Sequence, residues 1–384
     1  MSRRVFILGS TGSIGCNTIA AILHLREQDG QESWPVAGLA AGTNTSLLKE
    51  QCKQLSVESV SICAAESIGV DNQYGCASEL IRAQAKQGDL VVAAIVGFAG
   101  ILPVLDAIEM GCDIAIANKE TLVAAGDIIM RAAKKTKVQI LPVDSEHSAI
   151  FQALEGNALS EVKKIVLTAS GGSLRGFSYE EVRSASIEQV LNHPTWSMGT
   201  KVTVDSASLM NKSLELVEAH WLFSVGADQL QAIIHPQSIV HGMVEFVDGS
   251  IMAQLSPPDM RLPIQYALTW PNRTSGCSTT VDWQTFQNLT FEQIDTKVFP
   301  AIELAFTVMK QGGTSGAIMN AANEKVVDAF LAQKLSFGSM MPIVTEVLES
   351  ILIQEAACIE AVVEADREAR ALTDKLIALS KVNP

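Results

Sequence analysis

Short apolar runs alternate with longer amphipathic stretches over the first 143 residues, and this alternation restricts the possible folds more than any other feature of the chain. Strands and helices that alternate at this spacing form βαβ units, which build a parallel sheet. We therefore expect an α/β chain whose residues 1–143 form a doubly wound, Rossmann-like domain. The predicted strands are 5–8, 36–41, 59–63, 90–95, 113–117 and 138–141, and the predicted helices lie near 15–26, 45–55, 78–87, 99–110 and 121–135.

The pattern changes after residue 143. Predicted strands and helices are mixed over 144–275, including one long helix over "SASLMNKSLELVEAHWLF" at 206–223, which indicates a central α+β domain that we expect to carry catalysis. Residues 276–300 are polar and irregular and are interpreted as a linker. Helical periodicity then dominates 301–384, which predicts a C-terminal helical bundle.

Composition excludes several classes of protein. A net charge of -14 argues against nucleic-acid binding, which requires a basic face. The longest apolar run, 90–102, is too short to cross a bilayer, so no membrane association is expected. Seven scattered cysteines without a CxxC pair fit neither a disulfide framework nor a zinc site, and they indicate a reducing cytoplasm.

A glycine-rich turn, "ILGSTGSIG", joins the first predicted strand to the first predicted helix. It places Gly9, Gly12 and Gly15 three residues apart. Glycines at such a turn let backbone N–H groups approach a pyrophosphate at the helix N-terminus. The spacing is GxxGxxG instead of GxGxxG, so a plain glycine turn is the alternative. Its position at the start of a βαβ series favours a dinucleotide.

The end of the second predicted strand indicates which dinucleotide binds. NAD sites usually have an acidic residue there that bonds the ribose 2′-hydroxyl. This chain has "AAGTNTS" at 40–46 and no acid before Glu50. The hydroxyl and amide groups of 43–46 could donate to a 2′-phosphate at a helix start, so NADP is predicted over NAD.

The hexapeptide "PVDSEH" at 142–147 offers two carboxylates, Asp144 and Glu146. In an extended segment both would point to one face and could bind a metal ion. The alternative is a helix start with Asp144 as the N-cap and Glu146 in the first turn. Because Mg²⁺ requires several oxygen ligands, a third carboxylate would have to come from elsewhere.

Glu215 is the best candidate for that third carboxylate. On a helix it would share a face with Asn211 and Lys212. A solvated Lys–Glu pair is the alternative interpretation. Ser206 and Ser208 at a predicted strand-to-helix turn, and "TASGGS" at 168–173, could bind an anion. Together with "ANKET" at 117–121 and "NHPTWSMG" at 192–199, they favour a polar site facing the nucleotide domain.

Nine motifs taken in order resemble the 1-deoxy-D-xylulose 5-phosphate reductoisomerase family over nearly the whole chain. They are "GSTGSIG", "ANKE", "PVDSEHSAIFQ", "TASGG", "HPTWSMG", "VDSASLMNKSLE", "IHPQSIVHGMVE", "PPDMRLPI" and "FPAIELA…GGTSGAIMNAANE". The resemblance implies a cytoplasmic homodimer that uses NADPH and Mg²⁺ or Mn²⁺. It would rearrange and reduce the phosphorylated sugar 1-deoxy-D-xylulose 5-phosphate to 2-C-methyl-D-erythritol 4-phosphate, in non-mevalonate isoprenoid biosynthesis.

The resemblance also implies roles for individual residues. The expected metal ligands are Asp144, Glu146 and Glu215. The expected substrate-binding residues are Lys119, Ser145, Glu146, Ser170, His193, Ser206, Asn211, Lys212 and Glu215, with His241 nearby. Among these, Lys119, Glu146 and His193 are expected to act in catalysis. The expected cofactor-binding residues are Thr11, Gly12, Ser13, Ile14, Gly42, Asn44, Asn118, Glu120 and Gly199. His147 is interpreted as structural.

One departure from the family pattern concerns the cofactor. Many members have Lys or Arg where this chain has Thr43, so the preference for NADPH should be smaller here. Two rival functions are another metal-dependent NADP oxidoreductase acting on a phosphorylated hydroxy-carbonyl compound, and a non-catalytic dinucleotide sensor. A sensor would have no reason to keep Asp144, Glu146 and Glu215 together with Lys212.

Overall fold

The computed structural model describes residues 3–64, 67–196, 198–285 and 288–380. Its internal contacts divide the chain into two compact units. The first unit contains Met1–Thr121, Ile129–Ser148 and Asp259–Thr280, and the second contains Leu122–Ile128, Ala149–Pro258 and Val281–Pro384. The last four residues of the predicted C-terminal domain, 381–384, lie outside the described residues. The division into three functional domains stays a prediction.

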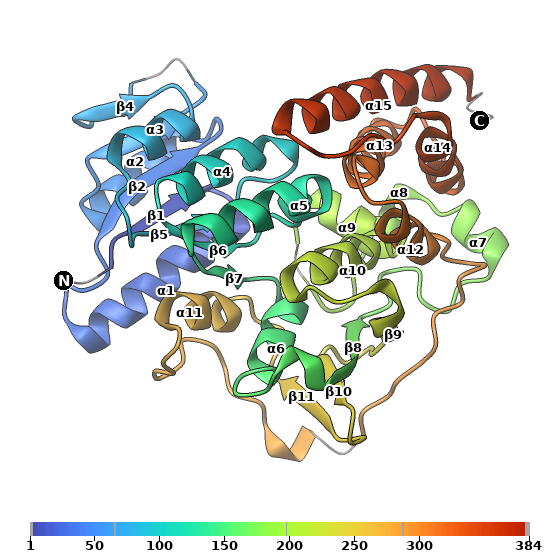
Figure 1. Cartoon of the computed structure of the whole chain (residues 1–384), viewed down its shortest axis with the longest axis horizontal. Coiled ribbons are helices and arrows are strands. Elements are labelled where there is room, and N and C mark those ends of the chain that lie inside the picture. The colour runs from blue at the N-terminus through green and yellow to red at the C-terminus, as the bar shows by residue number, and fades with distance from the viewer. Residues whose placement is uncertain (1–2, 65–66, 197, 286–287, 381–384) are drawn as a thin grey trace. The chain divides into compact units, whose positions relative to one another are not determined.

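A seven-stranded parallel sheet forms the centre of the first unit, which confirms the predicted doubly wound fold (Figure 1). The strand order is β4-β3-β2-β1-β5-β6-β7. The order reverses between β1 and β5, and ligands of such sheets bind beyond the carboxyl ends of the strands at that point. The strands are β1 (Val5–Leu8), β2 (Val36–Ala41), β3 (Ser59–Ile62), β4 (Asn72–Tyr74), β5 (Leu90–Ala93), β6 (Asp113–Ile116) and β7 (Ile140–Pro142).

The two central strands of this sheet, β1 and β5, are apolar throughout, as expected of parallel strands that are covered on both faces. Every residue of β1 and β5 is buried. The helices of this part are α1 (Ser13–Asp29), α2 (Thr45–Leu55), α3 (Ala77–Gln84), η1 (Phe98–Gly100), α4 (Ile101–Glu109), both ends of α5 (Lys119–Thr136), the start of α6 (Ser145–Ala153) and α11 (Arg261–Thr269). Helix α11 was expected in the central segment, but it packs against α1, β6 and β7 of the first unit.

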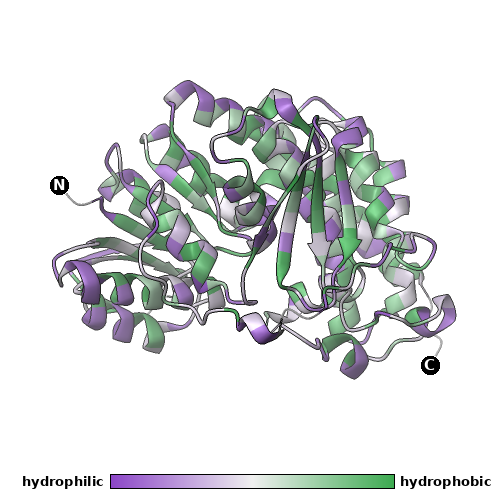
Figure 2. Cartoon of the chain, turned by 90° about the horizontal axis from the view of Figure 1, so that it is seen from below, coloured by the Kyte–Doolittle hydropathy of each residue, from purple (hydrophilic) through white to green (hydrophobic). Residues whose placement is uncertain are grey.

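The second unit contains a four-stranded mixed sheet in the order β11-β10-β8-β9. Strand β8 (Val162–Ala169) pairs in parallel with β9 (Leu230–Ile234) and antiparallel with β10 (Val240–Phe246). Strand β11 (Ile251–Leu255) pairs only with β10 among the described strands and forms one edge. Many of the hydrophobic residues, green in Figure 2, lie on the strands of the two sheets.

Helices make up the rest of the second unit. They are η2 (Leu159–Glu161), α7 (Tyr179–Arg183), α8 (Ile187–Leu191), α9 (Thr200–Ala207), α10 (Met210–Phe223), η3 (Ala227–Gln229), η4 (Trp283–Thr285), α12 (Ala301–Gln311), α13 (Ser315–Leu331), α14 (Phe337–Ser350) and α15 (Ile359–Leu379). The last four confirm the predicted helical C-terminal region. No helix in the described ranges has both the length and the apolar character needed to span a membrane.

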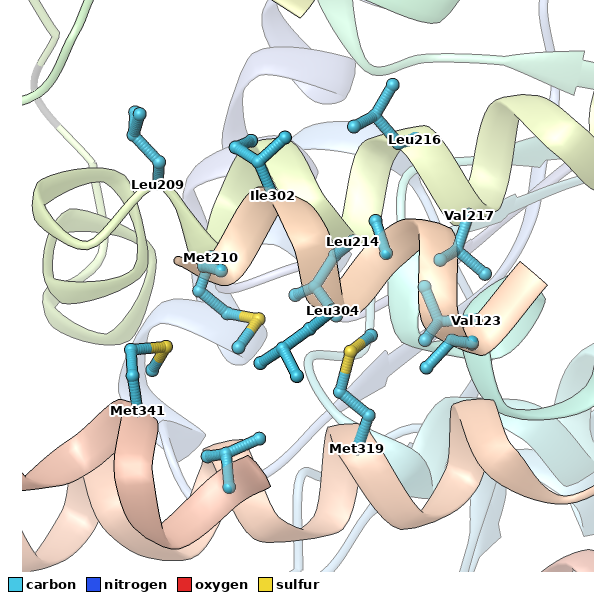
Figure 3. Close-up of a cluster of buried hydrophobic side chains, with 14 of the residues drawn as sticks. Val123, Leu209, Met210, Leu214, Leu216, Val217, Ile302, Leu304, Met319 and Met341 are labelled. Atoms are coloured by element: carbon cyan, nitrogen blue, oxygen red, sulfur yellow. The ribbon is translucent and has the colours of Figure 1, made fainter. Parts of the chain in front are cut away.

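Helix α10 is anchored in the core of the second unit. Met210 and Leu214 of α10 pack in one cluster with Leu304 of α12, Met319 of α13 and Met341 of α14 (Figure 3). All five side chains are buried. Because a packed core resists displacement of any one helix, α10 presents its polar residues from a rigid support.

The predicted single helix over 206–223, following a strand, is wrong. Residues 200–207 form helix α9, and the chain turns at Leu209, whose φ is +58°, before α10 begins. The β-branched residues before Ser206 suggested a strand, but α9 packs against α8, α10 and α13, and tertiary burial overrides that weak preference. Ser206 and Ser208 therefore lie at a helix-to-helix turn.

Candidate active site

The glycine turn between β1 and α1 is built by close backbone contacts. Gly9 has φ +90°, and a Cβ there would lie 2.4 Å from the Ala94 carbonyl oxygen. A Cβ on Gly15 would lie 2.3 Å from the Gly9 carbonyl oxygen. Only glycine fits at these two positions. Helix α1 starts with Gly12 as its N-cap and without a side-chain cap, so its first N–H groups suit an anion.

The turn after β2 lies at the same carboxyl edge of the sheet. Asn44 is the N-cap of α2, and its side-chain oxygen accepts a hydrogen bond from Leu47 N at 3.2 Å. Gly42, Thr43 and Asn44 are exposed. The predicted cofactor residues on the β1 and β2 turns therefore belong to one unit and one edge of one sheet.

Asn118 is the N-cap of α5, and both polar atoms of its side chain form hydrogen bonds within the protein. Its amide donates to the carbonyl oxygens of Ile95 and of Gly97, the latter at 2.9 Å, and its oxygen accepts from Thr121 N at 2.7 Å. The residue is only 3% exposed. Asn118 thus fixes the loop after β5. The neighbouring Glu120 is also buried.

Asp144 and Glu146 lie at the start of α6, so the extended conformation considered for this segment is wrong. Ser148 N donates to the Asp144 carbonyl oxygen at 2.8 Å, which begins the helix. The two residues nevertheless bring carboxylate oxygens within 4.8 Å of one another. Lys119 Nζ lies 2.6 Å from Asp144 Oδ2, and Ser145 Oγ donates to Glu146 Oε2 at 2.6 Å. His147, in the same turn, is fully buried.

Glu215 is not part of a solvated pair. It is 1% exposed and Lys212 is 3% exposed. The Lys212 ammonium and the Asn211 amide both bind the Glu215 carboxylate. A buried carboxylate is costly unless donors or cations compensate its charge, and α10 supplies both within one turn. This cluster belongs to the second unit.

His193 and Ser170 form a second polar cluster in this unit. His193 Nδ1 accepts from Thr195 N at 3.1 Å and from Trp196 N at 2.9 Å. The imidazole proton must therefore reside on Nε2, which lies 3.0 Å from Ser170 Oγ and donates to it. Ser170 Oγ also accepts from Gly172 N at 3.2 Å, so its own proton is left to donate outward.

The Ser170 turn packs against the end of α9. A Cβ on Gly172 would lie 2.4 Å from the Ser206 carbonyl oxygen, so the second glycine of "TASGG" allows this contact. The His193 loop also reaches the sheet, where the rings of Trp196 and His241 have centroids 6.2 Å apart. Ser170 thus contacts His193 directly, its turn contacts Ser206, and His241 lies beside Trp196 of the His193 loop. The roles of these residues stay a prediction.

The structure places each predicted residue in one of the two units. Thr11 to Ile14, Gly42, Asn44, Asn118, Glu120, Lys119 and 144–146 lie in the first, and Ser170, His193, Gly199, Ser206, Asn211, Lys212, Glu215 and His241 lie in the second. Gly199, the N-cap of α9, is the one predicted cofactor residue in the second unit. Sequence reasoning missed the supporting residues Thr121 and Gly172, although the glycine pair in "TASGG" was a visible signal.

Acidification should lower the folding stability of the second unit because His193 is half-buried there. Burial lowers the pKa of His193 below its ordinary value of about 6.5. As the pH falls below that value, the unfolded chain binds a proton that the folded chain resists, so stability is present at neutral pH and lost on acidification. We expect the thermal midpoint to drop less between pH 7.5 and pH 5.5 in His193→Gln than in the unmodified protein. Equal drops would contradict the role of His193.

Three family models match the chain. One described as 1-deoxy-D-xylulose 5-phosphate reductoisomerase covers residues 5–126, its C-terminal domain model covers 140–223, and a DXP reductoisomerase C-terminal domain model covers 255–372. Curated proteins of the same name are similar throughout. The Pelodictyon phaeoclathratiforme protein is 44% identical, covering 98% of this chain and all of that protein, and the Ruminiclostridium cellulolyticum protein is 42% identical with the same coverage.

Solved structures agree with these matches. The 1-deoxy-D-xylulose 5-phosphate reductoisomerase from Zymomonas mobilis in complex with NADPH is 36% identical, with a TM-score of 0.89 over 99% of this chain and all of that one. A DOX-P reductoisomerase in complex with NADPH, fosmidomycin and magnesium is 34% identical, with a TM-score of 0.91 over the full length of both chains. With two relatives above 40% identity over nearly the whole length, the chain belongs to the 1-deoxy-D-xylulose 5-phosphate reductoisomerase family.

Proposed function

We propose that this chain converts 1-deoxy-D-xylulose 5-phosphate into 2-C-methyl-D-erythritol 4-phosphate, as an NADPH- and divalent-metal-dependent reductoisomerase of isoprenoid biosynthesis. The observation that carries the proposal is the full-length similarity to reductoisomerases, one solved with NADPH and another with NADPH, fosmidomycin and magnesium. The chain keeps a dinucleotide turn, paired carboxylates and an anion-binding cluster in that framework. The rival oxidoreductase without rearrangement is not favoured, because the curated relatives that match this chain over nearly its full length are reductoisomerases.

The proposed metal ligands fit a hard divalent cation. Asp144, Glu146 and Glu215 offer only carboxylate oxygens, which Mg²⁺ and Mn²⁺ prefer. Their present partners are positively charged or hydrogen-bond donors, Lys119 on Asp144 and Lys212 on Glu215. A bound ion of this kind would polarise the substrate carbonyl and acidify the adjacent hydroxyl. Lys119, once exchanged from Asp144 toward the substrate, can offset negative charge on its oxygens.

The proposed cofactor residues fit a 2′-phosphorylated dinucleotide. Thr11, Gly12, Ser13 and Ile14 surround the uncapped start of α1, where backbone N–H groups can hold the pyrophosphate. Gly42, Asn44 and their neighbours form the exposed turn after β2, which has no acid to repel a 2′-phosphate. NADPH, when bound, supplies the hydride for the reduction. Asn118, Glu120 and Gly199 are proposed as further cofactor residues, on the similarity to the family.

The proposed phosphate site lies among Ser170, Ser206, Asn211 and Lys212. Ser170 has a hydroxyl proton free to donate because His193 and Gly172 occupy its acceptor positions. Lys212 supplies the positive charge that the acidic chain as a whole lacks. The His193 loop, tied to Ser170, can close over the substrate and exclude water. Ser145 is proposed to contact the sugar backbone.

The proposed cellular location is the cytoplasm. The reaction uses NADPH, a cofactor of the reducing interior of the cell, and all seven cysteines of the chain are free thiols. Scattered thiols are stable in a reducing compartment and would be at risk of oxidation outside it.

Glu215→Gln should lower turnover by at least about a thousandfold, because the amide removes a negatively charged metal ligand. NADPH affinity should stay within about twofold, since Glu215 belongs to the metal cluster. The measurement is NADPH oxidation with 1-deoxy-D-xylulose 5-phosphate at several Mg²⁺ concentrations, with product identification by NMR. Glu303→Gln, an exposed change on α12, is the matched control. Full turnover by Glu215→Gln, or by the unmodified protein without metal, would contradict the proposal.

The residue at position 43 should determine how strongly the protein prefers NADPH over NADH, expressed as the ratio of the two kcat/KM values. The unmodified protein is expected to prefer NADPH in kcat/KM, and Thr43→Arg should widen the ratio by about tenfold because a guanidinium forms charge-assisted hydrogen bonds with phosphate. Thr43→Gln, which adds length without charge, should leave the ratio within about twofold. Equal efficiency with both cofactors in the unmodified protein would refute the predicted preference.

The protein is further proposed to act as a homodimer through β11. This edge strand exposes apolar side chains on both faces, with Ile251 61% and Met252 51% exposed, and Val247 in the preceding turn is 67% exposed. An uncovered apolar edge is prone to pair with another strand. If two copies of β11 pair antiparallel across a two-fold axis, the backbone hydrogen-bonding groups at the edge of each sheet gain partners in the other copy.

Met252→Lys should dissociate the dimer by placing two charges in its centre. Light scattering coupled to gel filtration at micromolar concentration should show the mass of two chains for the unmodified protein and of one chain for the variant. Val363→Lys, a comparable change on exposed α15, should remain dimeric. If the unmodified protein is a monomer, the proposed dimer is contradicted. If Met252→Lys is still a dimer, the dimer does not form through β11.

A further inference from the structure

Gln51 of α2 makes a buried hydrogen bond to the glycine turn. Its Nε2 donates to the Ser10 carbonyl oxygen at 2.8 Å and lies 3.9 Å from Cys16 Sγ. The residue is 4% exposed, although glutamine is usually found at the surface. The donor of this buried amide is directed at the turn and is compensated there, whereas its Oε1 accepts no hydrogen bond from the described residues.

Ser10 has both of its peptide groups turned into the protein. Its N–H donates to the Ala40 carbonyl oxygen at 2.9 Å, and its carbonyl oxygen accepts from Gln51. The next residues, Gly12 and Ser13, are exposed. The inward bonds of Ser10 therefore hold the base of the turn while the tip faces solvent, where a ligand can reach its N–H groups.

The same helix begins at the other end of the proposed cofactor site. Asn44 is the N-cap of α2, and Gln51 lies two turns further along the helix. The amide of Gln51 thus ties the helix that presents Asn44 to the turn that presents Thr11 to Ile14. Together with the pairing of β1 and β2, this bond constrains the separation between the proposed ribose 2′-phosphate position and the proposed pyrophosphate position.

We propose that Gln51 is a positioning residue for NADPH, which it does not touch, and that it acts by holding the Ser10 carbonyl and with it the glycine turn. The proposal rests on the proposed function of that turn. It predicts a specific loss: a ligand that bridges both phosphate positions is weakened, whereas steps that depend on the sugar substrate and the metal are not.

Gln51→Met tests the proposal because methionine has a similar length and no N–H donor. Without this hydrogen bond the turn must be ordered when NADPH binds, so the Kd of NADPH is expected to rise by about tenfold, measured by fluorescence titration of the metal-free protein. The Michaelis constant for NADPH should rise by a similar factor. Both kcat and the Michaelis constant for the sugar phosphate should stay within about twofold of the unmodified values.

Cys52→Ala is the matched control. It changes the next residue of the same helix, which is buried, and should lower the thermal midpoint without changing the Kd of NADPH. The inference is overturned if Gln51→Met binds NADPH as tightly as the unmodified protein, or if Cys52→Ala weakens binding equally. An unmodified protein that does not bind NADPH would instead refute the function proposed for the turn.

Discussion

A buried carboxylate is stable only where cations and hydrogen-bond donors balance its charge, and this constraint organises the polar edges of both units. In the first unit Lys119 pairs with Asp144, which is partly buried at the start of α6. In the second, Lys212 and Asn211 balance Glu215 inside α10. Each arrangement depends on a helix that starts or turns at the right residue, and each helix is held by apolar packing on its other side. The hydrophobic cores are therefore the support on which a costly set of charges can be kept in place.

The acidic character of the chain makes local chemistry decisive. A net charge of -14 repels anions at a distance, yet the family's ligands carry phosphate groups. We propose that short-range groups bind these phosphates: the uncapped start of α1, the Ser170 hydroxyl and the Lys212 ammonium. Because such groups act over a few ångströms, they require close placement of the backbone, and the contacts at Gly15 and Gly172 are tight enough to exclude a Cβ.

Sequence predicted the elements that carry a strong periodic signal. The central strands β1 and β5 are continuous apolar runs and were predicted, whereas β4 is a short polar edge strand, "NQY", with no such signal. The break at Leu209 was missed because nothing in the local sequence requires a positive φ there, and packing decides it. The helical start of α6 was one of two alternatives, because the residues "PVDSEH" fit both a helix N-terminus and an extended segment with two carboxylates on one face.

Sequence motifs named candidate site residues, whose roles stay a prediction, but they did not predict the hydrogen bonds that these residues make. Asn118 was recognised by its motif, yet its partners are the backbone carbonyls of Ile95 and Gly97, which carry no sequence signature. The inward contact of Gln51 was not predicted, because a glutamine in a helix is expected to be exposed at the surface. Interactions between a side chain and a distant backbone group depend on the fold, so they appear only when the structure is known.

The hydrogen-bond pattern of Ser170 limits the chemistry of what can bind beside it. Its oxygen already accepts from an imidazole N–H and a backbone N–H, so the hydroxyl presents only a proton to a ligand. Phosphate, phosphonate and carboxylate oxygens satisfy that proton. An ammonium or amide N–H placed there would put one hydrogen-bond donor against another, the Ser170 hydroxyl. The orientation of one imidazole ring, set by two amides of its own loop, thus makes this corner of the protein a filter for hydrogen-bond acceptors.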